Sequence, residues 1–219
     1  MSQQQKTVRE RENIMANKSI YESVLGSTFS NLHPMLQKRY SVKNGRQLKA
    51  TGIMYQIKGG PKWLYPVWLL GTMCKLVFPE HGEHIPFTIT NQAYTTSEGV
   101  EEVHWERKFH FPKATRFFNA VMSYDKKRNM IKDYLGEPSP LYSDLQLIVE
   151  ADRSLTIQSV NQRLVLGPIE IPLPTFLHGI ATVKESYHDA EEQFHISVHV
   201  RNPLIGTVFA YEGVFTIDE

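Results

Sequence analysis

The sequence predicts a mainly β (α+β) protein, in which a curved antiparallel sheet or open barrel of about nine to ten strands wraps over a buried helix. Three observations predict this fold. After Pro79 apolar and polar residues alternate over most of the chain, the links between the alternating runs are short, and the segment Pro61–Leu76 is apolar on nearly all sides. A two-layer sandwich with the helix at one end is the structural alternative.

The N-terminal part is expected to be a tail followed by two short helices. Residues 1–18 are polar and charged, so we expect a disordered tail ahead of one β-rich domain over residues 19–219. Ser19 can cap a first helix, because Glu22 stands three residues later and completes a capping box. Pro34 fits the first turn of a second helix.

The remaining pattern predicts strands joined mostly by links of two or three residues. Links this short imply antiparallel hairpins, because a parallel crossover needs about a dozen residues or more. Closure or strong curling would protect the edges of so many strands. Gly213 interrupts one apolar strand face and is expected at a bulge or a close approach. The expected strands are 48–57, 84–94, 100–111, 115–124, 128–134, 144–151, 154–166, 180–188, 192–200 and 207–217.

The segment Pro61–Leu76 determines the predicted arrangement of the sheet around it. Trp63, Trp68 and Met73 do not share one stripe, and a helix that is apolar all round is either buried or in contact with lipid. The segment is interrupted by polar and helix-breaking residues and is shorter than a membrane span, so no transmembrane segment is expected. We therefore expect the sheet to enclose this helix.

Composition excludes several classes of protein. The formal net charge of +1 argues against nucleic acid as a partner. Cys74 is the single cysteine, so no internal disulfide can form, and the polar N-terminus does not resemble a signal peptide. We expect a cytoplasmic protein.

Several short motifs are distributed over the chain from about residue 28 to the C-terminus: Leu32–Tyr40, Phe78-Pro79 with Gly82, Ile85–Phe87, Arg107–Phe111, Pro203–Gly206 and Tyr211–Gly213. Together they resemble an uncharacterised bacterial family known as domain of unknown function 4166. In that family the domain also occurs joined to dehydrogenase-like dinucleotide-binding domains or to membrane segments. The resemblance therefore implies a ligand-holding or accessory module, with a dehydrogenase-like protein as a candidate partner, and implies no active-site residues. The chain has no Gly-x-Gly-x-x-Gly, so no cofactor is expected in it.

Arg107 is the most informative single residue, because it falls on the apolar face of its predicted strand, with Trp105 and Phe109. An unpaired buried charge is costly, so the guanidinium needs a partner. A carboxylate or phosphate group of a ligand would suit its planar fork. The alternatives are an arginine that reaches solvent at the rim, or an internal ion pair with Asp133 or Glu185, a more common arrangement.

We expect a site for a small apolar ligand with an acidic head group. The expected ligand-binding residues are Arg107, Trp105, Phe109, Trp68 and Tyr211; no catalytic or metal-binding residues are expected. His81 and His84 have ligand chemistry but lie in a short Pro/Gly loop.

Two other functions remain open at this stage. A cavity-type enzyme, an isomerase or hydrolase, would use His104, Glu106 or Asp133 in a lumen. A protein- or membrane-docking module would use the region of Trp63, Tyr65 and Trp68.

Overall fold

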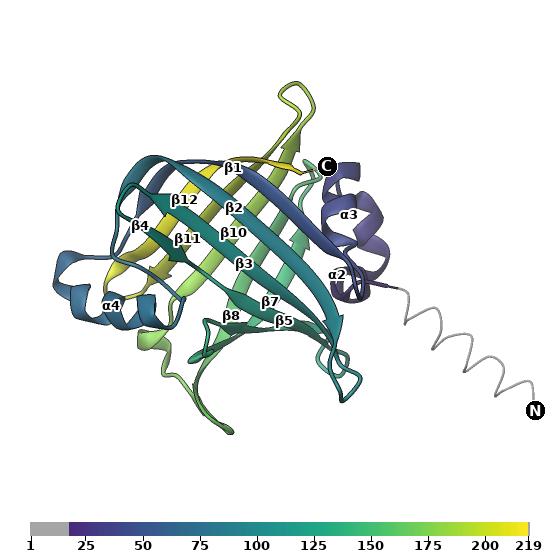
Figure 1. Cartoon of the computed structure of the whole chain (residues 1–219). Helices are drawn as coiled ribbons and strands as arrows, with labels where there is room; N and C mark the ends of the chain where they lie inside the picture. Colours follow the sequence, from purple (N-terminus) through teal and green to yellow (C-terminus); the bar gives the residue numbers. More distant parts are fainter. Residues whose placement is uncertain (1–17, 219) are drawn as a thin grey trace, which may run out of the picture.

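The computed structural model describes residues 18–218 and shows a closed barrel of ten antiparallel strands (Figure 1). Around the barrel the order is β1-β2-β3-β5-β6-β7-β8-β10-β11-β12, and β12 returns to β1. Two further strands are added outside this circuit: β4 pairs with β3, and β9 pairs with β8. The strands are β1 (Gln47–Lys58), β2 (Gly82–Thr95), β3 (Glu101–Phe111), β4 (Ala114–Phe117), β5 (Ala120–Asp125), β6 (Met130–Leu135), β7 (Leu141–Val149), β8 (Leu155–Leu166), β9 (Ile169–Pro172), β10 (Ile180–His188), β11 (Gln193–Asn202) and β12 (Gly206–Ile217).

The predicted antiparallel barrel is confirmed, with two differences in its strands. The expected strand 115–124 is divided into β4 and β5 at Phe118 and Asn119. The Phe118 N–H still donates to the Arg107 carbonyl of β3, whereas the Asn119 N–H turns to the Lys75 carbonyl, outside the sheet. β9 was not predicted, since its segment reads as a proline-rich corner. Most of the predicted tail, residues 1–17, lies outside the described residues.

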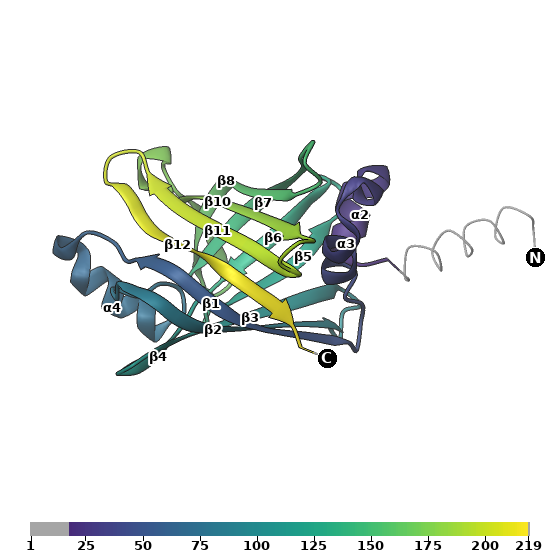
Figure 2. The same cartoon turned by 90° about the horizontal axis from the view of Figure 1, so that it is seen from above.

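Short helices cover one end of the barrel (Figure 2). They are α2 (Ile20–Leu25), the 3₁₀ turn η1 (Gly26–Asn31) and α3 (Pro34–Tyr40). The capping box at Ser19 is present, with Glu22 accepting from the Ser19 N–H at 2.7 Å. Ile20, Leu36 and Tyr40 join the barrel core, so this end is packed.

A second helical segment lies at the other end of the barrel (Figures 1 and 2). It consists of the 3₁₀ turn η2 (Lys62–Leu64) and α4 (Tyr65–Met73), in the link from β1 to β2. A third 3₁₀ turn, η3 (Thr175–Leu177), lies in the link from β9 to β10. None of the helices within residues 18–218 has the length and apolar character to span a bilayer.

The prediction that the barrel encloses the Pro61–Leu76 helix is wrong. Trp63 is 70% exposed and Met73 is 78% exposed, and within α4 only Trp68 and Gly71 are buried. β1 and β2 are neighbours, so their link starts and ends at the same rim and stays there. Part of the interior is instead filled by an aromatic cluster of Phe78, Phe87, Phe109, Phe209 and Tyr211, whose ring centroids lie 4.9–6.4 Å apart in contacting pairs.

Candidate functional site

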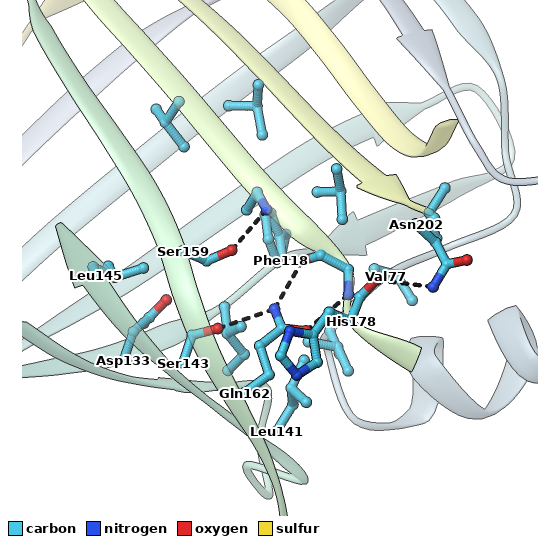
Figure 3. Close-up of a pocket in the computed structure, with 18 of the residues that line it drawn as sticks. Val77, Phe118, Asp133, Leu141, Ser143, Leu145, Ser159, Gln162, His178 and Asn202 are labelled. Atoms are coloured by element: carbon cyan, nitrogen blue, oxygen red, sulfur yellow. Dashed lines mark hydrogen bonds between the residues drawn. The ribbon is translucent and has the colours of Figure 1, made fainter. Parts of the chain in front are cut away.

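Because α4 does not enter the barrel, part of the interior is left as a cavity of about 300 Å³. Its wall is mostly apolar and is built from the inner faces of strands on both sides of the barrel (Figure 3). At the α4 end the lining includes Leu64, Val67 and Trp68 from the helical segment, together with Leu177 and Ile205. The cavity therefore extends from the α4 end into the barrel, while the N-terminal helices cover the opposite end.

Arg107 lies in the wall of this cavity and is only 4% exposed. Its Nε donates to the Phe118 carbonyl at 2.7 Å, and its guanidinium carbon lies 4.0 Å from the centroid of the Phe118 ring. Within residues 18–218 the Arg107 guanidinium forms no salt bridge with a carboxylate. A buried guanidinium thus has one carbonyl and two aromatic rings, Phe118 and Trp105, for partners, but no counter-ion in contact.

The two carboxylates considered as partners of Arg107 have other positions. Glu185 belongs to Arg39 of α3: Arg39 Nε lies 2.7 Å from Glu185 Oε2 and Nη2 lies 3.1 Å from Oε1, and both side chains are buried. An ion pair between Arg107 and Glu185 is therefore contradicted. Asp133 lines the same cavity as Arg107 but does not form a salt bridge with it.

Asp133 is an unusual carboxyl group, because it is buried and incompletely hydrogen-bonded. It is 4% exposed, and its Oδ1 has no hydrogen-bond partner within residues 18–218. Burial raises the pKa of Asp133 to about 7, and the positive charge of Arg107 only partly opposes this. Both the neutral acid and the carboxylate are therefore accessible near neutral pH.

A polar network borders the cavity near η3 and joins β8 to the start of β10 (Figure 3). The Gln162 amide donates to Ser143 Oγ at 3.1 Å and to the Gly179 carbonyl at 2.8 Å, and accepts from the Gly179 N–H at 2.8 Å. Ser159 Oγ accepts from the Ala181 N–H at 2.8 Å. These bonds satisfy the polar groups and hold the wall together, so their observed role is structural.

The sequence analysis missed these polar lining residues. Ser159 could have been found, because it shares an inner strand face with Leu155 and Ile157, as a polar residue among apolar ones. Gln162 could not, since the strand pairing shifts between Ser159 and Gln162 and breaks the period of two.

The structure brings three of the five predicted ligand-binding residues together. Trp68, Trp105 and Arg107 line the cavity. Phe109 and Tyr211 are buried in the adjoining aromatic cluster, where their ring centroids lie 5.1 Å apart. The Tyr211 hydroxyl, like Asp133 Oδ1, makes no hydrogen bond of standard geometry in the described part of the chain; burial raises its pKa, and nearby Arg107 opposes the rise.

The other candidate acid–base residues lie outside the lumen. His104 and Glu106 project from the outer face of β3: His104 Nε2 lies 2.6 Å from Glu137, and Glu106 pairs with Lys108. His81 and His84 are not buried. His188, Glu191 and His195, on the hairpin of β10 and β11, have possible ligand atoms within 4.8 Å of one another, but the hairpin is mostly exposed and these residues do not line the cavity.

Comparisons with known proteins bear on the family. The family model described as "Domain of unknown function (DUF4166)" matches residues 32–215. The chain is 39% identical over 201 residues to "Uncharacterized protein YndH" of Bacillus subtilis (strain 168), an alignment that covers 92% of this chain and 98% of that protein. The residues matched by the family model include the motifs around Pro34, Arg107 and Gly213 on which the resemblance depended. The chain therefore belongs to the family of domain of unknown function 4166.

Proposed function

We propose that this protein binds a small apolar molecule with an acidic head group inside the barrel, with the head group at Arg107. The observation that carries the proposal is a buried guanidinium in an apolar cavity without a carboxylate in contact. Buried charges in proteins are normally paired, and a ligand carboxylate or phosphate would supply the missing partner.

Asp133 supports an anionic head group. With its pKa raised to about 7, its neutral form can be populated at neutral pH, and that form leaves Arg107 as the uncompensated charge of the pair. The protonated carboxyl can also donate a hydrogen bond, for which Oδ1 has no competing partner in residues 18–218. A ligand anion would further favour the protonated form.

The size and lining of the cavity restrict the ligand. About 300 Å³ is at the lower end of the ~300–1,000 Å³ that is typical of small-molecule sites. The wall is mostly apolar, so most of the ligand must be hydrocarbon-like, with Trp68 and Trp105 among its contacts. A medium-chain fatty acid fits this description better than a long phospholipid.

Titration calorimetry with decanoate and decanol tests the proposal, because the two probes share a chain and differ in the head group. We expect decanoate to bind the wild-type protein more tightly than decanol. Arg107→Leu keeps apolar volume and removes the charge, so it is expected to weaken decanoate binding roughly tenfold to hundredfold, as the loss of a charge-assisted hydrogen bond does. Decanol binding is expected to change little.

Arg46→Leu is the matched control, since Arg46 is exposed in a turn and its loss leaves the cavity intact. Circular dichroism checks that each variant is folded. If Arg107→Leu loses affinity for decanoate and decanol equally, the arginine has a structural role. If the wild-type protein binds neither probe, the proposal is contradicted.

A second candidate function, a cavity-type isomerase or hydrolase, is favoured by one observation: Asp133 is a carboxyl group in the lumen with a pKa of about 7, suited to general acid–base catalysis. His104 and Glu106 are not available to it, because they face outward. Loss of turnover in Asp133→Asn with retained ligand binding would favour this function over simple binding.

A further inference from the structure

The mouth of the cavity is bordered by exposed apolar side chains from three separate segments, here called the apolar rim. Soluble proteins seldom expose so many large apolar residues together unless the surface meets a partner. In both views α4 and the link before β10 lie at the same end of the barrel, and Val67, Leu177 and Ile205 meet in one cavity lining (Figures 1 and 2). The apolar rim consists of Trp63, Tyr65, Val67, Leu69, Leu70 and Met73 from η2 and α4, Phe176 and Leu177 from η3, and Leu204 from the β11–β12 turn.

The segments that supply the apolar rim carry only basic charges, and the neighbouring Glu137 and Glu80 are paired with Lys75 and Arg116. Residues 58–79, 171–183 and 201–211, which supply it, contain four lysines and arginines and no aspartate or glutamate, although the whole chain has 24 basic and 23 acidic residues. Lys75 pairs with Glu137 from a neighbouring loop. Lys58, Lys62 and Arg201 are exposed, and no ion pair is found for them within residues 18–218. An apolar surface with unpaired lysine and arginine side chains suits a partner that has an anionic surface and an apolar interior.

We propose that the apolar rim docks onto the surface of a bilayer that contains anionic lipids. Tryptophan and tyrosine favour the boundary between head groups and acyl chains, and Trp63 and Tyr65 are the most projecting aromatic residues of α4 and its preceding turn. Lys62 and Arg201 can reach lipid phosphates while neighbouring apolar side chains enter the boundary. α4 lies on the surface and does not cross it.

Docking in this orientation places the mouth of the cavity against the lipid. An apolar molecule could then move between the bilayer and the barrel with little exposure to water, past Leu64 and Trp68. This transfer step rests on the proposed function, whereas docking itself does not require an occupied cavity.

Co-sedimentation with vesicles tests the docking. One set of vesicles is phosphatidylcholine alone, and the other is an equal mixture of phosphatidylcholine and phosphatidylglycerol. We expect the protein to bind the mixed vesicles more tightly, and the bound fraction to fall as salt is added, because salt screens exposed charges. Trp68 and Trp105 are buried, so a blue shift of tryptophan emission on binding would report mainly on Trp63.

Two sets of variants separate the apolar and charged contributions. The triple variant Trp63→Ser, Leu70→Ser, Met73→Ser is expected to lower the partition coefficient about tenfold or more, since buried apolar area drives interfacial binding. Lys62→Glu with Arg201→Glu is expected to abolish the preference for phosphatidylglycerol. The matched control, Ile53→Ser, Tyr55→Ser, Val100→Ser, removes exposed apolar residues from β1 and the β2–β3 turn and is expected to bind as wild type does.

Several outcomes would overturn the proposal. The first is that the protein does not bind mixed vesicles, and the second is that the rim triple variant binds them as tightly as the wild type. The third is that sedimentation velocity shows a dimer which only the rim triple variant disrupts, because a second copy of the chain would then cover the apolar rim. Arg107→Leu is expected to dock normally. Docking without decanoate binding would therefore refute the ligand proposal alone, and decanoate binding without docking would refute this one alone.

Discussion

Arg107 and Asp133 line one apolar cavity but form no salt bridge or hydrogen bond with each other, and this is the central feature at the scale of single residues. Elsewhere in the barrel a buried charge is fully matched: Arg39 contacts both oxygens of Glu185 and also reaches Asn91. The contrast indicates that the cavity pair is not maintained for stability. A buried carboxyl group with a raised pKa lowers the stability of the folded state when it must ionise.

The pH dependence of stability should reveal this cost. The pKa of Asp133 is raised from 3.8 to about 7 in the folded protein, so the native state holds a proton that the unfolded state has already lost. Its contribution to stability is present at low pH and is lost as pH rises towards 7. Asp133→Asn is therefore expected to gain, relative to wild type, on the order of 4 kcal/mol of unfolding free energy between pH 4 and pH 8.

Urea unfolding at a series of pH values measures this difference. Asp125→Asn is a control of opposite sign, because a hydrogen bond from Arg128 lowers the pKa of Asp125, so that its contribution appears as pH rises. Parallel stability curves for wild type and Asp133→Asn would mean that Asp133 ionises as freely in the folded protein as in the unfolded chain.

The position of Arg107 on an inner face could be predicted from sequence, because the period of a strand places it with Trp105 and Phe109. The identity of its neighbours could not. Asp133 and Glu185 were equivalent candidates in the sequence, and only the barrel shows that Glu185 is already bound by Arg39 of α3. Contacts between residues far apart in the chain depend on strand order, which periodicity does not determine.

At the scale of elements, β1 and β12 cross closely, and two glycines make this possible. Gly52 and Gly213 lie at the ladder between these strands, next to the bulge after Met54. A Cβ atom at Gly213 would stand 2.2 Å from the Ile53 carbonyl oxygen and 2.6 Å from Met54 Cα. The close approach expected for Gly213 from its place on an apolar face is thus confirmed.

Gly213→Ala is expected to destabilise the protein by roughly 2–4 kcal/mol, because backbone atoms would have to move apart. Chemical denaturation gives the value. Thr207→Ala, on an exposed position of the same strand, is the control and is expected to have little effect. A Gly213→Ala variant as stable as Thr207→Ala would show that the two strands separate without cost.

Most elements could be predicted from the sequence because local patterns define them. The capping box of Ser19 and Glu22 marks α2, and alternation marks the strands. α4 was placed correctly along the chain but in the wrong environment. A helix that is apolar on all sides can be buried in protein or can contact another apolar phase, and composition alone does not distinguish these two environments.

At the scale of the whole molecule, the barrel closes through one of its two shortest ladders, since β3 and β5 also pair at only four positions. β8 and β10 pair at four positions, from Thr182 with Gln158 to Glu185 with Leu155, whereas β10 and β11 pair at nine. Beyond this ladder the side chains of Ser159 and Gln162 bond to the backbone of Gly179 and Ala181 and continue the closure. The number of antiparallel strands predicted a curved sheet or open barrel; full closure, and the use of side chains in it, were not predicted.

Hydrogen exchange tests the importance of these side chains. Gln162→Ala is expected to speed amide exchange in peptides that cover residues 179–185, while peptides from β1 and β2 keep their protection, because the loss opens only the closing ladder. Gln158→Ala is the matched control, since Gln158 is exposed on the same strand. Uniform faster exchange throughout the barrel would indicate general destabilisation instead.

The packed N-terminal helices have a kinetic consequence. They close one end of the barrel, so a molecule that enters past α4 must leave by the same route. With its head group at Arg107, its tail would point back towards the entrance. Residence time would then depend on how readily Trp68 and its helix yield, and on nothing at the far end of the molecule.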